Sequence, residues 1–96
     1  MATQRVDLGV ELRTAIREME TYKRRCDTME AAALQWFTDG PGVRADLPGN
    51  PEGLADAWLR TDGDYKAATA RYRFYAERVR TLTAAIKALR EGAAHA

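Results

Sequence analysis

Apolar side chains in the second half of the chain recur at alternating spacings of three and four residues. The series consists of Tyr65, Ala68, Tyr72, Tyr75, Val79, Leu82, Ile86 and Leu89. This heptad spacing places an apolar stripe along one side of an α-helix, and such a stripe is stabilised by packing against another helix. The pattern therefore predicts a long amphipathic helix over residues 62–91.

A second stripe with the same spacing occupies the first half of the chain. Its members are Leu8, Leu12, Ala15, Met19, Tyr22, Cys26, Met29, Ala33 and Trp36. This series predicts a helix over residues 5–37, in which Ile16 and Phe37 widen the apolar side. We expect Asp7 to cap its first turn and Glu11 to interact favourably with the helix dipole there. We refer to the two apolar stripes together as the seam.

Turn-forming residues separate the two long helices. The segment DGPGVRADLPGN at residues 39–50 predicts a loop, because its glycines supply a left-handed exit residue and proline cannot continue a helix. Asn50 followed by Pro51 is typical of an N-cap and a first helical position. The sequence thus predicts a short helix over residues 51–60.

The second long helix has its own boundary signals. Thr61 with Asp64 three residues later resembles a capping box, with aspartate in place of the usual glutamate or glutamine. Gly92 follows the last seam residue and predicts the end of this helix.

The two long helices have nearly equal lengths of about 30 residues, or roughly 45 Å. We therefore predict an all-α fold: an antiparallel coiled-coil helical hairpin that forms a single domain over residues 1–96. A loop and the short helix would cover its closed end. This topology also predicts a contact between Glu18 and Arg78. The expected seam pairs are Leu8 with Leu89, Leu12 with Ile86, Met19 with Val79, Cys26 with Tyr72, and Ala33 with Tyr65.

Aromatic side chains gather near the predicted closed end. Trp36, Phe37 and Trp58 would fill a small core there, together with the apolar side chains Val43, Leu47 and Leu54. If the loop left these rings uncovered, they would form a partner-binding patch. The four tyrosines lie on the seam, where we expect the rings to pack and the hydroxyls to reach its rim.

The sequence lacks the residue sets of common catalytic sites. It contains one histidine, His95, and neither a phosphate-binding glycine-rich loop nor a zinc-binding HExxH motif. We therefore expect a protein that is not an enzyme and has no cofactor or metal site. The single cysteine, Cys26, lies on the seam and is interpreted as a buried structural thiol. A redox-sensitive thiol is the alternative, because basic residues at positions 23–25 precede it.

A chain with one cysteine forms no internal disulfide and fits a reducing compartment. Its first residues lack an apolar run of signal-peptide length, and no window approaches the roughly 18 apolar residues of a membrane span. We therefore expect a cytoplasmic protein without a membrane partner. Arginine outnumbers lysine twelve to three, which indicates GC-rich coding and a bacterial or phage source.

Charge is distributed unevenly although the net charge is only +1. Residues 38–64 carry six acidic and two basic side chains, whereas residues 66–91 carry seven basic and two acidic ones. Lys66, Arg73, Arg80 and Lys87 recur every seven residues. They form a stripe, here called the basic ladder, with about 10.5 Å between neighbours. Arg71 and Arg78 are expected on an adjacent flank, with Phe74 close by.

Two hypotheses of function follow from these patterns. The first is a non-enzymatic helical interaction protein, namely an adaptor, assembly component or inhibitor, that acts through protein–protein contacts. A single seam leaves half of each helix exposed, so we also expect a homo-oligomer. The alternative is a small nucleic-acid-associated protein, such as a phage or mobile-element accessory factor, since a row of cations can follow a phosphate backbone. Such a row can equally be a solvated face or pair with acidic residues of another subunit. The predicted partner-binding residues are Lys66, Arg71, Arg73, Phe74, Arg78, Arg80 and Lys87.

Overall fold

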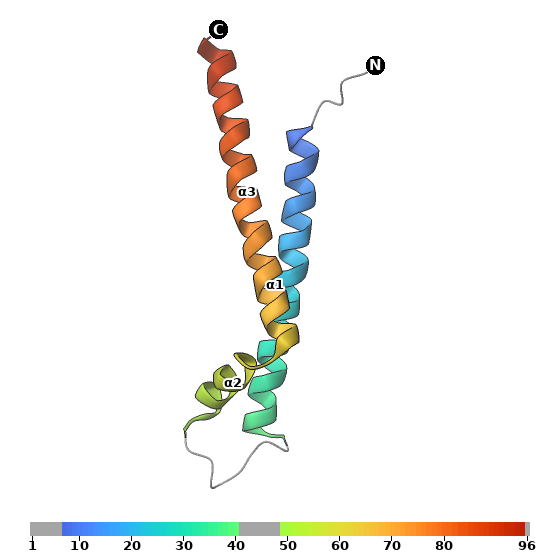
Figure 1. Cartoon of the computed structure of the whole chain (residues 1–96), viewed down its shortest axis with the longest axis vertical. Coiled ribbons are helices and arrows are strands. Elements are labelled where there is room, and N and C mark those ends of the chain that lie inside the picture. The colour runs from blue at the N-terminus through green and yellow to red at the C-terminus, as the bar shows by residue number, and fades with distance from the viewer. Residues whose placement is uncertain (1–6, 41–48, 96) are drawn as a thin grey trace.

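The protein is an elongated antiparallel helical hairpin with a short helix at its closed end (Figure 1). The computed structural model describes residues 7–40 and 49–95. Helix α1 spans Leu8–Thr38, α2 spans Pro51–Leu59 and α3 spans Gly63–His95. These elements confirm the predicted all-α hairpin. The described helices include none that is long and apolar enough to cross a membrane.

The N-terminal caps of α1 and α2 confirm two predictions. The Asp7 carboxylate accepts hydrogen bonds from the backbone N–H groups of Gly9 and Val10, at 3.0 and 3.2 Å. The Asn50 side-chain oxygen accepts one from the Gly53 backbone at 2.7 Å, with proline in the first turn. Both caps satisfy backbone donors that have no partner inside the helix.

The C-terminal end of α1 lies where predicted but is built differently. Gly40 does not adopt the expected left-handed conformation; among the described residues only Gly49 has a positive φ, of 100°. Glycine is favoured at position 40 by close approach, because a Cβ there would lie 3.0 Å from the Trp36 backbone. The backbone N–H groups of Asp39 and Gly40 both donate to the Gln35 carbonyl.

Both predicted boundary signals of α3 are wrong. Asp62, rather than Thr61, caps the helix, because its carboxylate accepts from the Tyr65 N–H at 2.9 Å. The Thr61 hydroxyl instead donates to the Trp58 carbonyl at 2.7 Å. At the other end α3 continues through Gly92 to His95, since the intervening alanines have high helix propensity.

Small side chains make up most of the buried interior, which consists of the seam and one side of α2. The buried residues are Ala15, Cys26, Ala33, Ala55, Leu59, Ala68 and Leu82. Leu59 of α2 packs against Ala33 of α1, and Tyr65 at the start of α3 packs on the same cluster. Tyr65 thus lies beside the cluster that contains Ala33.

Contacts between α1 and α3 establish the antiparallel register. Tyr22 stacks on Tyr75 with ring centroids 5.9 Å apart. The Cys26 thiol is buried and lies 3.8 Å from the Thr69 hydroxyl, which is one turn nearer the closed end than the predicted Tyr72. The expected pair of Glu18 with Arg78 is wrong, because Arg78 contacts Glu11 at 3.1 Å.

The seam is incomplete at both ends of the hairpin. Toward the termini the axes of α1 and α3 diverge (Figure 1), and Leu89 is 63% exposed, so the expected burial against Leu8 is wrong. At the closed end α1 extends past the first turn of α3. Trp36 is therefore 51% exposed and does not join the core as predicted. Val43 and Leu47 of the predicted small core lie outside the described residues.

Packing of α2 on α1 can be tested at Leu59. We expect Leu59→Ala to lower the free energy of unfolding by about 2–4 kcal/mol, because the buried leucine fills the contact with Ala33. Leu34→Ala, at an exposed position of α1, is the control and should cost less than about 0.5 kcal/mol. Urea unfolding followed by circular dichroism measures both. Equal losses would show that α2 does not stabilise the hairpin.

Candidate functional site

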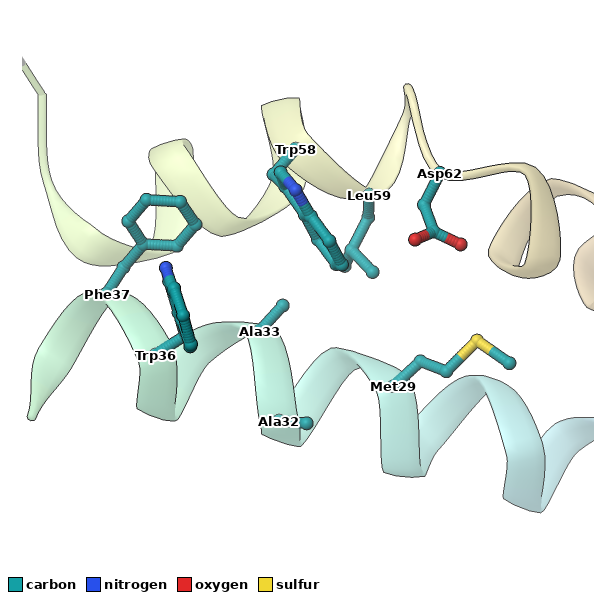
Figure 2. A pocket seen from close by; sticks show the side chains of 8 residues that line it. All are labelled: Met29, Ala32, Ala33, Trp36, Phe37, Trp58, Leu59 and Asp62. Carbon is teal, nitrogen blue, oxygen red and sulfur yellow. The ribbon is translucent and has the colours of Figure 1, made fainter. Parts of the chain in front are cut away.

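An apolar groove lies between the C-terminal part of α1 and helix α2 (Figure 2). Its volume is about 370 Å³. Most of its lining is apolar, and one carboxylate reaches it. The lining residues are Met29, Ala32, Ala33, Trp36, Phe37, Trp58, Leu59 and Asp62. We call this feature the aromatic groove.

Helical spacing brings the α1 residues of the aromatic groove to one side of that helix. Met29, Ala33 and Trp36 follow one another at spacings of four and three, so they lie along one stripe. The buried side chains Ala33 and Leu59 are part of the lining. Because alanine is small, the space between the larger side chains is left unfilled.

Two tryptophans from different helices border this space. Figure 2 shows Trp36 extending from α1 and Trp58 extending from α2 toward the region between the helices. Their exposed fractions are 51% and 49%. Phe37 lies beside Trp36, while Met29 and Asp62 lie toward the other end (Figure 2). The groove thus presents large aromatic surfaces to the solvent, as binding sites commonly do.

A smaller depression continues the aromatic groove along α1. Its lining includes Gln35 and Asp39 and shares Ala32 and Trp36 with the groove. The combined depression therefore follows α1 from Met29 to Asp39, which is about 15 Å at the helical rise.

Carboxylates dominate the charge around the aromatic groove. Among described residues 39–64 the single basic side chain is Arg60, and Asp56 pairs with it at 3.0 Å. Asp62 lines the groove itself and Asp39 lines the adjoining depression. The acidic residues of this region are Asp39, Glu52, Asp56, Asp62 and Asp64. The groove is therefore apolar inside and acidic around its edge.

The basic ladder lies on the exposed surface of α3, but two of its four cations have acidic neighbours. Arg80 pairs with Glu77 at 3.1 Å, and Lys87 lies 3.9 Å from Glu91. Lys66 and Arg73 are exposed and make no ion pair within the part of the chain that the structure describes. The ladder thus carries less unpaired positive charge than the sequence alone predicts.

Arg71, Phe74 and Arg78 do not extend the ladder. At 100° per residue the two arginines lie roughly 140–160° around α3 from the ladder stripe. Arg78 bonds Glu11 of α1, and Arg71 lines a hollow with Tyr22 of α1. Phe74 is 59% exposed on the same flank as these arginines. The seven residues predicted to bind a partner therefore belong to two separate surfaces.

Sequence reasoning named both tryptophans but missed two parts of the groove. Asp62 was assigned to the break between helices, and Met29 to the coiled-coil seam. Sequence periodicity gave no signal for Asp62, because α2 ends at Leu59 and Asp62 lies in the turn that follows it. The described residues hold no group of three or more histidine, cysteine or acidic side chains arranged to bind a metal.

Comparisons of this chain with models of protein families, with curated proteins and with solved structures found no match.

One titratable side chain near the aromatic groove has a perturbed pKa. The Tyr65 hydroxyl donates a hydrogen bond to the Glu30 carboxylate across the helix pair, at 2.6 Å. This bond, partial burial and the negative charge of Glu30 raise the pKa of Tyr65 above its ordinary value of 10.0. The bond confirms that a seam tyrosine places its hydroxyl at the rim.

The raised pKa predicts a pH dependence of stability. The folded chain holds the Tyr65 proton more tightly than the unfolded chain, so this contribution is full below about pH 10 and is lost as pH rises through the folded pKa. We expect Tyr65→Phe to cost about 0.5–1 kcal/mol at pH 7 and to reduce the alkaline loss. Tyr72→Phe, at another half-buried seam position, is the control. Urea unfolding at pH 7 and above pH 10 measures the effect; identical pH profiles for both variants would contradict it.

Proposed function

We propose that the protein is a non-enzymatic helical interaction protein that binds a protein partner in the aromatic groove. Such a protein would serve as an adaptor, assembly component or inhibitor. The observation that carries this proposal is the exposure of Trp36 and Trp58 on opposite sides of one apolar groove. Tryptophan is enriched among the residues that contribute most to binding energy, and burying two exposed rings supplies a large favourable term.

The length of the groove favours a helical segment as the occupant. The depression along α1 from Met29 to Asp39 measures about 15 Å, which matches about three turns of a docked helix. A helix that binds such a groove presents apolar anchors at spacings of three, four and seven residues. The exposed faces of the Trp36 and Trp58 rings can contact those apolar anchors.

The charge around the groove favours a basic partner. Asp39 and Asp62 border the apolar interior, and the surrounding described residues carry further carboxylates. The occupant we propose is therefore an amphipathic helix with lysine or arginine beside its apolar anchors. Charges at a rim mainly raise the association rate and select the partner, so binding should weaken as salt increases. We propose the cytoplasm as the setting, because Cys26 is a free thiol.

A designed peptide tests this proposal. The probe is an amphipathic helix with leucine at heptad-spaced positions and lysine elsewhere. It should bind saturably and shift the tryptophan emission to shorter wavelength, because both tryptophans of the chain border the groove. Trp36→Ala should weaken binding by at least about 30-fold, measured by calorimetry.

Two controls make the peptide test specific. Phe74→Ala removes another exposed aromatic ring, on α3 and away from the groove, and should leave the affinity unchanged. A peptide with glutamate in place of lysine should bind much more weakly, and Asp62→Asn should reduce this discrimination. Equal losses in Trp36→Ala and Phe74→Ala would contradict binding in the aromatic groove. Equal affinity for the two peptides would contradict a basic partner.

Nucleic-acid binding through the basic ladder is the second candidate function. It is supported by Lys66 and Arg73, which are exposed and unpaired within the described chain. Their neighbours Arg80 and Lys87 have acidic side chains within 4 Å, which lowers the charge available to phosphates. We rank this candidate second for that reason.

A DNA-binding assay over a salt series tests the second candidate. If the ladder binds nucleic acid, fluorescence anisotropy with labelled double-stranded DNA at low salt should detect binding. The logarithm of its affinity should fall with the logarithm of salt concentration by about 0.9 per phosphate contacted. Lys66→Glu with Arg73→Glu should abolish binding, whereas Arg13→Glu, at an exposed position of α1, should weaken it only slightly. Absence of binding at about 50 mM salt would reject this candidate.

A further inference from the structure

A second hollow lies on one side of the contact between α1 and α3, and shares only Met29 with the aromatic groove. Its volume is about 450 Å³. Ala67 and Ala68 of α3 line its apolar part together with Met29, and the small alanines leave the space above them unfilled. Two arginines also line it, Arg25 from α1 and Arg71 from α3. We call this feature the arginine hollow.

The two arginines lie at nearly the same level of the hairpin. The Cys26 thiol of α1 lies 3.8 Å from the Thr69 hydroxyl of α3. Arg25 precedes Cys26 by one residue and Arg71 follows Thr69 by two, so the antiparallel register brings the arginines opposite each other. Neither forms an ion pair within the part of the chain that the structure describes. Like charges repel, so an anion held between the two guanidinium groups would relieve an unfavourable interaction.

The Arg25 guanidinium is positioned by an aromatic stack. Its Cζ atom lies 5.1 Å from the centroid of the Tyr22 ring. That ring stacks on Tyr75 of α3, with an angle of 7° between the ring planes. A guanidinium over an aromatic ring keeps the N–H donors at its edge free for a carboxylate or a phosphate. Because the stack joins both helices, Arg25 is positioned before a ligand binds, which lowers the entropic cost of binding.

Of the described residues that line the arginine hollow, Asp64 is the only carboxylate. Asp64 precedes Arg71 by seven residues, so their Cα atoms lie on one stripe of α3 about 10.5 Å apart. Asp64 therefore lies toward the closed end of the hairpin, and the two arginines lie toward the other end of the hollow. An anion between the arginines is thus attracted by two nearby cations and is about two helical turns from the carboxylate.

We propose that the arginine hollow binds the phosphate group of an organic phosphate monoester. Such a group carries a charge of about −1.5 to −2 at pH 7 and three strong acceptor oxygens, which match two guanidinium groups. The apolar body of the ester then lies against Ala67, Ala68 and Met29. The volume of the hollow falls within the range of about 300–1,000 Å³ that is typical of small-ligand sites. This site is separate from the aromatic groove and does not depend on the partner proposed there.

Calorimetry with phenyl phosphate near neutral pH tests the proposal, because this compound joins a phosphate group to a flat apolar ring. The wild-type chain should bind one molecule per chain, with saturation below about 10 mM. Arg71→Gln and Arg25→Gln should each weaken binding by about tenfold or more, since each removes charge-assisted hydrogen bonds. Both arginines are exposed, so the circular dichroism of the variants should remain that of the wild type.

Arg73→Gln is the matched control. It removes the same charge from the same helix, but Arg73 lies on the basic ladder, roughly 160° around α3 from Arg71. This variant should bind phenyl phosphate like the wild type. Equal weakening by Arg71→Gln and Arg73→Gln would overturn the proposal, because attraction by the overall charge would then explain the binding. Absence of saturable binding to the wild-type chain would also overturn it.

Two simpler anions test the class of ligand. Benzoate has the same ring but a single negative charge, and inorganic phosphate lacks the ring; both should bind more weakly than phenyl phosphate. Equal affinity for benzoate would overturn the assignment to a phosphate monoester. Equal affinity for inorganic phosphate would overturn the role of the apolar part of the hollow.

A phosphotyrosine peptide distinguishes two sources of the same chemical group. Tighter binding of this peptide than of phenyl phosphate would support a phosphorylated protein as the source, and equal or weaker binding would support a free small molecule.

Trp36→Ala separates this site from the proposed function. This variant should lose affinity for the amphipathic peptide but bind phenyl phosphate like the wild type, because Trp36 lines only the aromatic groove and its adjoining depression. Loss of phenyl phosphate binding in Trp36→Ala, with wild-type binding in Arg71→Gln, would overturn the proposal, because the phenyl ring would then occupy the aromatic groove.

Discussion

Small side chains along the line of contact determine how closely α1 and α3 approach. Ala15, Ala33 and Ala68 are among the most buried residues of the protein. The distance between packed helices depends on the size of the side chains at their contact, so alanine permits a close approach. Alanine also removes little apolar area from water, and each such contact stabilises the fold only modestly. The larger tyrosines and methionines of the seam lie half-buried at its edges, where polar links such as Tyr65 with Glu30 connect the helices.

Incomplete pairing of α1 with α3 determines the structure of the closed end. The last turns of α1 extend past the first turn of α3 and so are not paired with it. The nine-residue helix α2 packs against these turns of α1 instead. Leu59 of α2 covers Ala33, whereas Trp36 of α1 and Trp58 of α2 stay about half exposed. The aromatic groove is thus the part of the seam where a long partner helix has been replaced by a short one. The proposed interaction partner would supply the missing helix.

Periodicity predicted the elements well because both stripes of the seam continue for at least eight positions without a slip. It did not predict where the pairing stops, since a heptad pattern describes one helix and carries no information about the end of its partner. Trp36 and Leu89 satisfy the pattern but lie beyond the paired region, and both are exposed. Gly92 failed as a stop because alanines rather than a turn follow it. An exposed aromatic patch was predicted only as one of two alternatives, because the sequence does not show whether the loop at residues 39–50 covers these rings.

The divergence of α1 and α3 gives the hairpin a preferred direction of opening. Links between the helices are concentrated from the closed end to the middle, where the rings of Tyr22 and Tyr75 stack. Fewer buried contacts lower the free energy of local unfolding, so the terminal turns of a single chain separate first. Opening is therefore expected to proceed from the termini toward α2. In a single chain, the surface around the two tryptophans thus keeps its shape while the opposite end fluctuates.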